Sequence, residues 1–386
     1  GIAVDAVSSN LLTNAADVDD DNGALVIGEV NGDAGNVGSA ITVTLAYTDT
    51  DGNSQNQAVD LTVDADGSYS ITGVDLDALP AGENATGTFT YKVTDDEGAL
   101  SSPQTATVTI SGTNDAPLTS GAITDASAVE AGVAADGTPV SGSDATGGAD
   151  ALFVNITDTD SDPRALTITG AKSAFGQLDS VPAGSTASNG LSVSTQFGSL
   201  SVGADGSYRY SIDNDNSTVE ALSGVNTLLD AFTVAVSDGA GGSVEHTLNI
   251  EIQGTNDAPT LTAGSVSNTE DELESGIAVD AGSSNLLTNA ADVDDDNAAL
   301  VIGEVNGDPT NVGSAVTVSL SYTDADGNIQ NQDVDLTVSG DGSYSVASVD
   351  LDALPAGQDA TGSFTYQVAD DDGALSSPQT ATVTIS

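Results

Sequence analysis

The chain has 386 residues, with 59 Asp and Glu against 4 Lys and Arg, a formal net charge of -55, and neither Cys nor Met. The absence of Cys excludes disulfides and thiolate chemistry. A surface this acidic repels nucleic acid phosphates and anionic lipid headgroups, so neither is expected as a partner. Self-repulsion on this scale indicates that bound cations neutralise part of the charge when the chain folds.

Strands are the predicted elements along the whole chain. Apolar and polar residues alternate with period two at 40–47, 87–93 and 105–110, as in half-buried strands, and helical periodicity is nearly absent. Asp-Gly and Asn-Gly pairs separate these runs and supply the positive φ of tight hairpins. No apolar stretch approaches the roughly 20 residues of a membrane span, so direct membrane insertion is not expected. No signal peptide is visible at Gly1, and we expect the chain to be processed or a fragment.

An internal repeat organises the chain. Residues 1–111 align with 276–386 without gaps, and roughly four in five positions are identical. The hexapeptide at 112–117 recurs at 254–259 and reads as a linker, because its Pro cannot donate to a strand ladder. We therefore expect three modules, at 1–113, 114–255 and 256–386. The first lacks a counterpart of 260–275, so its first strand is expected to be missing.

Short strands at this spacing favour an all-β fold of tandem Ig-like antiparallel β-sandwiches in an elongated array, with about seven strands per module. The apolar core is light, with few aromatic residues, so ions are expected to contribute to stability.

Acidic clusters are the sharpest chemical signal. Ca²⁺ takes six to eight oxygen ligands, and Asp-x-Asp delivers two from one short segment. An isolated Asp-Gly such as Asp66 is more often a solvated turn residue. The segment from Asp49 to Asn53 is interpreted first as a hairpin and second as a weak calcium site. The lack of Cys and the single His disfavour transition metals. The predicted Ca²⁺ ligands in these clusters are Asp17, Asp19, Asp21, Asp292, Asp294, Asp296, Asp95, Asp96, Asp370, Asp371, Asp158 and Asp160.

Two resemblances add to this interpretation. Residues 118–259 resemble a VCBS repeat through Ala204-Asp205-Gly206-Ser207-Tyr208-Arg209-Tyr210, Ser237-Asp238-Gly239 and the closing linker. The duplicated module resembles the cadherin-like, tandem-95-type repeats of bacterial RTX adhesins through Asn10-Leu11-Leu12-Thr13-Asn14, Asp17-Val18-Asp19 and Asp95-Asp96-Glu97-Gly98.

The cadherin-like resemblance implies Ca²⁺ at the module junctions, a rigid extender of a secreted bacterial adhesin, and an extracellular location on the cell surface or in a biofilm matrix. Neighbouring repeats would be its partners. The implied ligands of the first junction are Asn114, Asp115, Glu130, Asp158 and Asp160. Those of the second junction are Asn256, Asp257, Glu270 or Asp271, Asp292 and Asp294, with Asp370 or Asp371 nearby.

Other functions are weighed against the extender. An enzyme is not expected, because His246 lies in an alternating run where we expect it to point outward, and no catalytic motif is present. The main rival is an extracellular filament subunit whose missing strand another copy donates. A carbohydrate- or ice-binding module is disfavoured by the absence of Trp. Gln367 replaces Lys92 in the second copy, which argues against an isopeptide cross-link. Lys92, Lys172, Arg164 and Arg209 are expected to be local charge partners.

Overall fold

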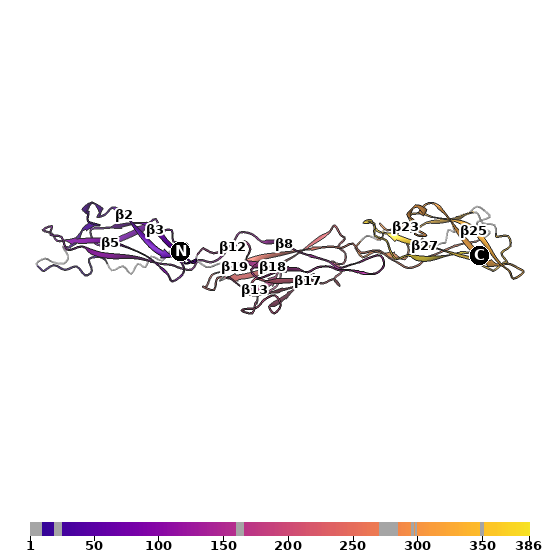
Figure 1. Cartoon of the computed structure of the whole chain (residues 1–386), viewed down its shortest axis with the longest axis horizontal. Coiled ribbons are helices and arrows are strands. Elements are labelled where there is room, and N and C mark those ends of the chain that lie inside the picture. The colour runs from indigo at the N-terminus through magenta and orange to yellow at the C-terminus, as the bar shows by residue number, and fades with distance from the viewer. Residues whose placement is uncertain are drawn as a thin grey trace.

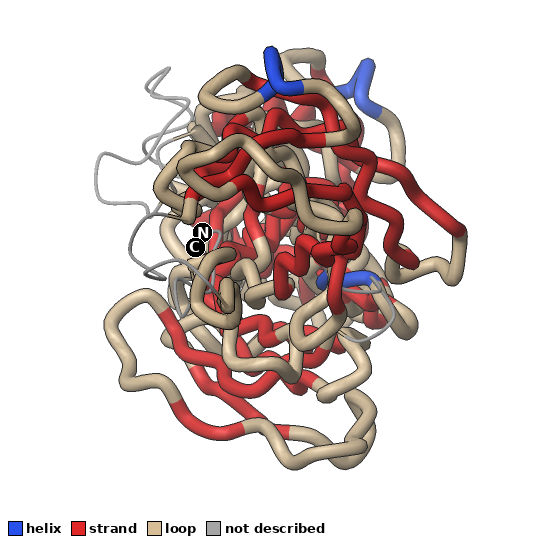
Figure 2. The backbone as a smooth tube through the Cα atoms, turned by 90° about the vertical axis from the view of Figure 1, so that its left-hand side faces the viewer, coloured by secondary structure: helices blue, strands red, loops and turns tan. Residues whose placement is uncertain are grey.

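A computed structural model describes residues 10–18, 25–159, 166–269, 285–294, 297, 299–347 and 351–386. The modules lie end to end in an elongated array (Figure 1), and the prediction of tandem all-β sandwiches is confirmed. Figure 2, a view along the long axis, shows strands throughout and short helical turns. The described helices are η2 (Ala34–Asn36), η3 (Ala151–Phe153) and η5 (Pro309–Asn311). None of them is long and apolar enough to cross a membrane.

The first module contains one sheet in the order β1-β5-β2-β3-β4, with β6 paired to β5. The long β5 pairs with β6 over most of its length, and its last residues pair with β1. The strands are β1 (Val26–Val30), β2 (Ala40–Thr48), β3 (Ser54–Val63), β4 (Tyr69–Thr72), β5 (Asn84–Thr94) and β6 (Gln104–Ser111).

The middle module is a sandwich of a five-stranded sheet, β14-β13-β18-β19-β8, and a four-stranded sheet, β11-β17-β16-β15. Its β8 runs parallel to β19, whereas the other pairs of this module are antiparallel. The strands are β7 (Leu118–Thr119), β8 (Ile123–Val129), β9 (Gly132–Val133), β10 (Pro139–Val140), β11 (Ala145–Gly147), β12 (Ile156–Thr157), β13 (Thr167–Ser173), β14 (Asp179–Ser180), β15 (Leu191–Ser194), β16 (Gly198–Val202), β17 (Tyr208–Ile212), β18 (Thr227–Ser237) and β19 (Ser243–Gln253).

The last module repeats the pairing of the first and adds β21, which runs parallel along the outer edge of β28, together with the short pair β20-β22. Its strands are β20 (Thr260–Leu261), β21 (Ser265–Asn268), β22 (Ala290–Ala291), β23 (Val301–Val305), β24 (Ala315–Thr323), β25 (Ile329–Val338), β26 (Tyr344–Ala347), β27 (Ala360–Ala369) and β28 (Gln379–Ile385).

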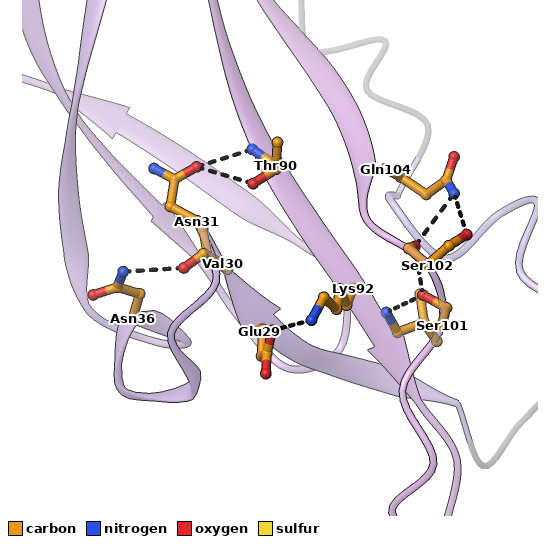
Figure 3. A network of polar contacts seen from close by, with 10 residues as sticks. Glu29, Val30, Asn31, Asn36, Thr90, Lys92, Ser101, Ser102 and Gln104 are labelled. Atoms are coloured by element: carbon orange, nitrogen blue, oxygen red, sulfur yellow. Dashed lines mark hydrogen bonds and ion pairs between the residues drawn. The ribbon is translucent and has the colours of Figure 1, made fainter.

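Local polar contacts fix the turns of the first module (Figure 3). Asn31 has a φ of 51° and Gly32 a φ of 78°, the left-handed pair that a two-residue hairpin loop requires. The Asn31 side chain then accepts a hydrogen bond from the Thr90 amide at 2.9 Å and ties this turn to β5. Lys92 on β5 pairs with Glu29 on β1 at 2.7 Å. The same turn recurs at Asn306, whose side chain accepts from the Thr365 amide.

The predicted charge pairs and the predicted hairpin at Asp49 are confirmed among the described residues, and the predicted orientation of the single His is wrong. Lys172 pairs with Glu245 at 2.8 Å and Arg209 with Asp144 at 2.6 Å, while Arg164 lies outside the described residues. The segment from Asp49 is a hairpin, with the Asp49 carboxylate accepting from the Asn53 amide at 2.8 Å. The outward orientation predicted for the single His is wrong.

The His246 side chain is buried, with 1% exposure, between β19 and β7. Its Nδ1 lies 2.8 Å from the Thr119 hydroxyl. Period two places His246 on the same face as Val244 and Leu248, which explains its burial.

Candidate metal centres at the module junctions

The second linker crosses from the middle module into the last module and bonds to both. It follows β19 directly and leads into β20. The Asn256 side-chain amide donates to the Asp370 carboxylate at 2.9 Å, and the Asp257 backbone amide donates to the Asp294 carboxylate at 2.9 Å. Both carboxylates belong to the last module. The linker therefore lies among acidic side chains that the following module supplies.

The middle module supplies further carboxylates to the same place. Glu130 follows β8, and Glu220 comes from the loop between β17 and β18. One carboxylate oxygen from each of Glu130, Glu220 and Asp257 lies within 4.8 Å of the other two. Two oxygens that bind one Ca²⁺ at 2.3–2.6 Å lie at most about 5 Å apart, so this spacing suits a shared ion. We call Glu130, Glu220, Asn256, Asp257, Asp292, Asp294 and Asp370 the second-junction cluster.

The assignment of Glu130 to the first junction is therefore wrong. Because β8 runs parallel to β19, the residue after β8 lies beside the residues after β19. The Thr255 amide donates to the Glu130 carboxylate at 3.3 Å, and the Thr255 hydroxyl donates to the Glu130 carbonyl at 2.8 Å. Glu130 thus lies at the second junction.

Several oxygens of the second-junction cluster are buried without a hydrogen-bond donor among the described residues. They are Glu130 Oε1, Asn256 Oδ1 and Asp257 Oδ2, and the side chains of Glu130 and Asp257 are 0% and 3% exposed. An uncompensated buried carboxylate costs several kcal/mol, so such groups are normally paired or bound to metal. The described residues of this cluster include no Lys, Arg or His.

Burial dominates the electrostatics of the cluster. Burial is the main cause that raises the pKa of Glu130 to about 7. The Glu220 and Asp257 carboxylates contribute to this rise, and the Thr255 hydrogen bond opposes it. Burial also raises the pKa of Asp294 to about 8, together with the adjacent Asp292 carboxyl. Burial is also the main cause that raises the pKa of Asp257. These carboxylates disfavour one another's ionised form, and a divalent cation would remove that penalty.

The donor set fits Ca²⁺. Every side-chain atom that the cluster presents is a carboxylate or amide oxygen, apart from the Asn256 nitrogen that is already donating to Asp370. Hard oxygen ligands with room for several carboxylates are what Ca²⁺ prefers, and nitrogen or sulfur ligands of transition metals are lacking.

A hairpin of the middle module also reaches across the second junction. It is formed by β9 and β10, and the Val133 amide donates to Asp257 Oδ1. The Ala258 amide donates to the Val133 carbonyl at 2.9 Å. Farther along, the Ser377 hydroxyl of the last module donates to the Ala135 carbonyl at 2.6 Å. The two modules are therefore joined by direct hydrogen bonds beside the acidic cluster.

The first junction repeats the arrangement on a smaller scale. The Asn114 side-chain amide donates to Asp238 at 2.8 Å, as Asn256 does to Asp370. Asp238 is 5% exposed, and its other oxygen accepts from the Ala240 and Gly242 amides at 2.8 and 3.0 Å. Asn114 Oδ1 is buried without a donor among the described residues. Asp115 and Asp158 are half-buried.

The remaining predicted ligands fall into three groups. Asp17 and Asp95 line one cavity of the first module. Asp96 and Asp371 are exposed in turns. The others lie outside the described residues, and they are Asp19, Asp21, Asp160, Glu270, Asp271 and Asp296.

Glu220 and Asp238 were missed by the sequence prediction. Asp238 had a recognisable signal, because Asp238-Gly239 follows the penultimate strand of its module as the acidic run from Asp370 to Gly373 follows β27. Glu220 had none, because its approach to Glu130 depends on how two distant loops meet.

Comparisons with known proteins give a fold likeness only. No family model matches the chain, and no curated protein matches it. Among solved structures, human CDH23 EC21-23 is similar at 14% identity and a TM-score of 0.39, covering 94% of this chain and 88% of that one. The human desmocollin-1 ectodomain is similar at 13% identity and 0.33, covering 89% and 54%.

Drosophila N-cadherin EC1-4 is similar at 15% identity and a TM-score of 0.34, covering 84% of this chain and 62% of that one. The chain thus spans about half the length of the desmocollin-1 ectodomain.

Proposed function

We propose that this chain is a Ca²⁺-stiffened spacer of a large extracellular adhesion protein, and that the ions bind at the junctions between modules. One observation carries the proposal: buried oxygen atoms from two successive modules and from the linker between them converge, and the described residues of this cluster include no Lys, Arg or His. An ion that binds both modules stabilises one relative orientation of them. In the second-junction cluster, Glu130 and Glu220 come from the middle module and Asp294 and Asp370 from the last.

An extracellular location is part of the proposal. Extracellular Ca²⁺ modules work at roughly 10⁻⁴–10⁻³ M, a concentration that the cytosol does not provide. A bacterial cell surface or biofilm matrix is the proposed setting, supported by the sequence resemblance to RTX adhesin repeats. We propose no catalytic role. The single His is buried beneath β7, and its ring contacts the Thr119 hydroxyl.

Distance measurements across the second junction test the proposal. The chain contains no Cys, so cysteines introduced at the exposed Gln253 and Thr380 can carry spin labels without background. With millimolar Ca²⁺, pulsed electron resonance should give one narrow distance distribution. After EDTA the distribution should broaden about twofold or more, because repelling carboxylates no longer share an ion.

Matched substitutions assign the effect to the cluster. Asp294→Asn should raise the Ca²⁺ concentration needed for the narrow distribution by about tenfold or more, as loss of a metal-site interaction does. Asp333→Asn removes the same charge from an exposed position in β25 and should leave the titration unchanged. Equal distribution widths with Ca²⁺ and with EDTA would contradict the proposal.

A further inference from the structure

The two near-identical modules differ in how well the same residues are buried. In the last module Tyr366 is 1% exposed and Val368 0%, and Leu286 is 2% exposed. Their counterparts in the first module, Tyr91, Val93 and Leu11, are only half-buried. Since the side chains are the same, the difference comes from what packs on them.

The packing partner in the last module is the segment Asn256 to Asn268. The Asn256 side-chain amide donates to the Asp370 carboxylate, and Thr260 and Leu261 pair with Ala291 and Ala290. The Gly264 amide donates to the Tyr366 hydroxyl at 2.8 Å.

The rest of this segment is β21. It lies parallel on β28, with Val266 opposite Val383 and fully buried. One extended segment therefore binds through an amide, a two-residue ladder, a tyrosine hydroxyl and a strand edge.

The first module has a cavity of about 520 Å³ lined by the counterparts of these contact residues. Ala15 and Ala16 correspond to Ala290 and Ala291, Asp95 to Asp370, and Tyr91 to Tyr366. Among the described residues, β6 pairs with β5 alone, so the edge that corresponds to the β21 side of β28 has no neighbouring strand. The Tyr91 hydroxyl donates instead to the Leu11 carbonyl at 3.3 Å.

We infer that the cavity and the edge of β6 that has no strand partner among the described residues form a docking site for an extended Asn-Asp-Ala-Pro-led segment, of the Asn256–Asn268 type, presented by another repeat. Its register follows from the last module. The residue equivalent to Val266 lies opposite Val108, and the residue equivalent to Gly264 donates to Tyr91. Strand addition requires an exposed strand edge beside a hydrophobic pocket.

Charge also favours this occupant. Residues 254–269 carry one Asp and no other charge before Glu270, so the segment approaches the acidic first module with little repulsion. The inference stands apart from Ca²⁺ stiffening, because the ladder, the tyrosine contact and the strand edge need no ion.

The test uses the full chain and a synthetic peptide with the sequence of residues 254–269, labelled with a fluorophore. Anisotropy should show saturable binding with a dissociation constant below about 1 mM. Hydrogen exchange should show new protection in Gln104–Ser111 and none in Gln379–Ile385, because β28 already holds β21. Both measurements are made in Ca²⁺ and again in EDTA, so that failure of binding is distinguished from failure of Ca²⁺ stiffening.

Matched variants locate the site. Tyr91→Phe should weaken peptide binding by about fivefold, the effect of one lost hydrogen bond, and Tyr366→Phe should leave it unchanged. A peptide with Val266→Asp should bind at least about tenfold more weakly, because the Val266 side chain is fully buried in the last module. The inference is overturned if Gln104–Ser111 gains no protection, if a scrambled peptide binds equally well, or if the chain without peptide dimerises through this edge.

Discussion

Replacing Glu130 by Gln should change the stability of the middle module in opposite directions with and without Ca²⁺. Without the ion, Glu130 is a fully buried carboxyl beside Glu220 and Asp257. Its pKa of about 7 lies above the ordinary 4.5. A raised pKa means stability that is present below pH 4.5 and lost as the pH rises through 7, by at most about 3 kcal/mol.

At pH 8 in EDTA the Gln variant escapes that loss. It should be more stable than the wild type by up to about 3 kcal/mol. With Ca²⁺ the sign reverses, because the carboxylate charge is compensated in the wild type and one ligand is missing in the variant. A 10- to 100-fold weaker affinity removes about 1.4–2.7 kcal/mol of linked stability.

Native-state hydrogen exchange of the β19 amides measures these changes, since β19 is an inner strand of the five-stranded sheet and reports the opening free energy of the middle module. Glu245→Gln is the matched control. It removes the same charge from a side chain that is 56% exposed and paired with Lys172, and it should change stability little in either condition. If Glu130→Gln destabilised β19 equally in EDTA and in Ca²⁺, Glu130 would be a structural residue and the metal reasoning would be refuted.

Three further predictions concern buried groups. Burial lowers the pKa of His246 below 6.5, so the stability of the middle module should hold above pH 6.5 and fall below it, and His246→Gln should flatten this pH dependence in thermal melts. Val266→Ala should destabilise the last module by about 1–2.5 kcal/mol, whereas Val301→Ala, at a site 43% exposed, should change it by less than about 0.5 kcal/mol in urea denaturation. Tyr210→Phe removes the 2.8 Å hydrogen bond to the buried Asp230 and should cost about 1–3 kcal/mol. The Thr195 hydroxyl also donates to Asp230, and an unchanged denaturation midpoint would show that Thr195 alone satisfies that carboxylate.

The local sequence pattern predicted most of the strands and turns. Period-two alternation marked β2, β5 and β6, and the turn pairs marked their ends, because strand and hairpin preferences are set by neighbouring residues. The long-range pairings were not predictable in the same way. That β8 lies parallel to β19 and β21 parallel to β28 depends on how the modules close, and this direction decides at which end of the module Glu130 lies.

The His246 error had a different cause. The sequence does contain the signal, because His246 shares the parity of Val244, Leu248 and Ile250 on β19. The prediction gave more weight to the polar character of His246 than to its position in the alternating pattern. The linker Asn and Asp residues were recognisable because they recur as a motif, whereas Glu220 is a single residue in a loop and becomes a candidate only when Glu130 and Asp257 are seen beside it.

The two copies of the duplicated module show which features depend on the sequence of the repeat itself and which depend on the neighbouring module. Tyr91 and Tyr366 have nearly the same sequence around them, yet only Tyr366 is fully buried. The segment after β19 completes the core of the last module, while Glu130 and Glu220, from the middle module, face the same linker. Each linker is thus a folded part of the module that follows it and also contributes side chains to the acidic cluster at its junction. Cations bound there would couple the stability of the linker segment to the orientation of both modules, so stiffness and folding at a junction should rise and fall together.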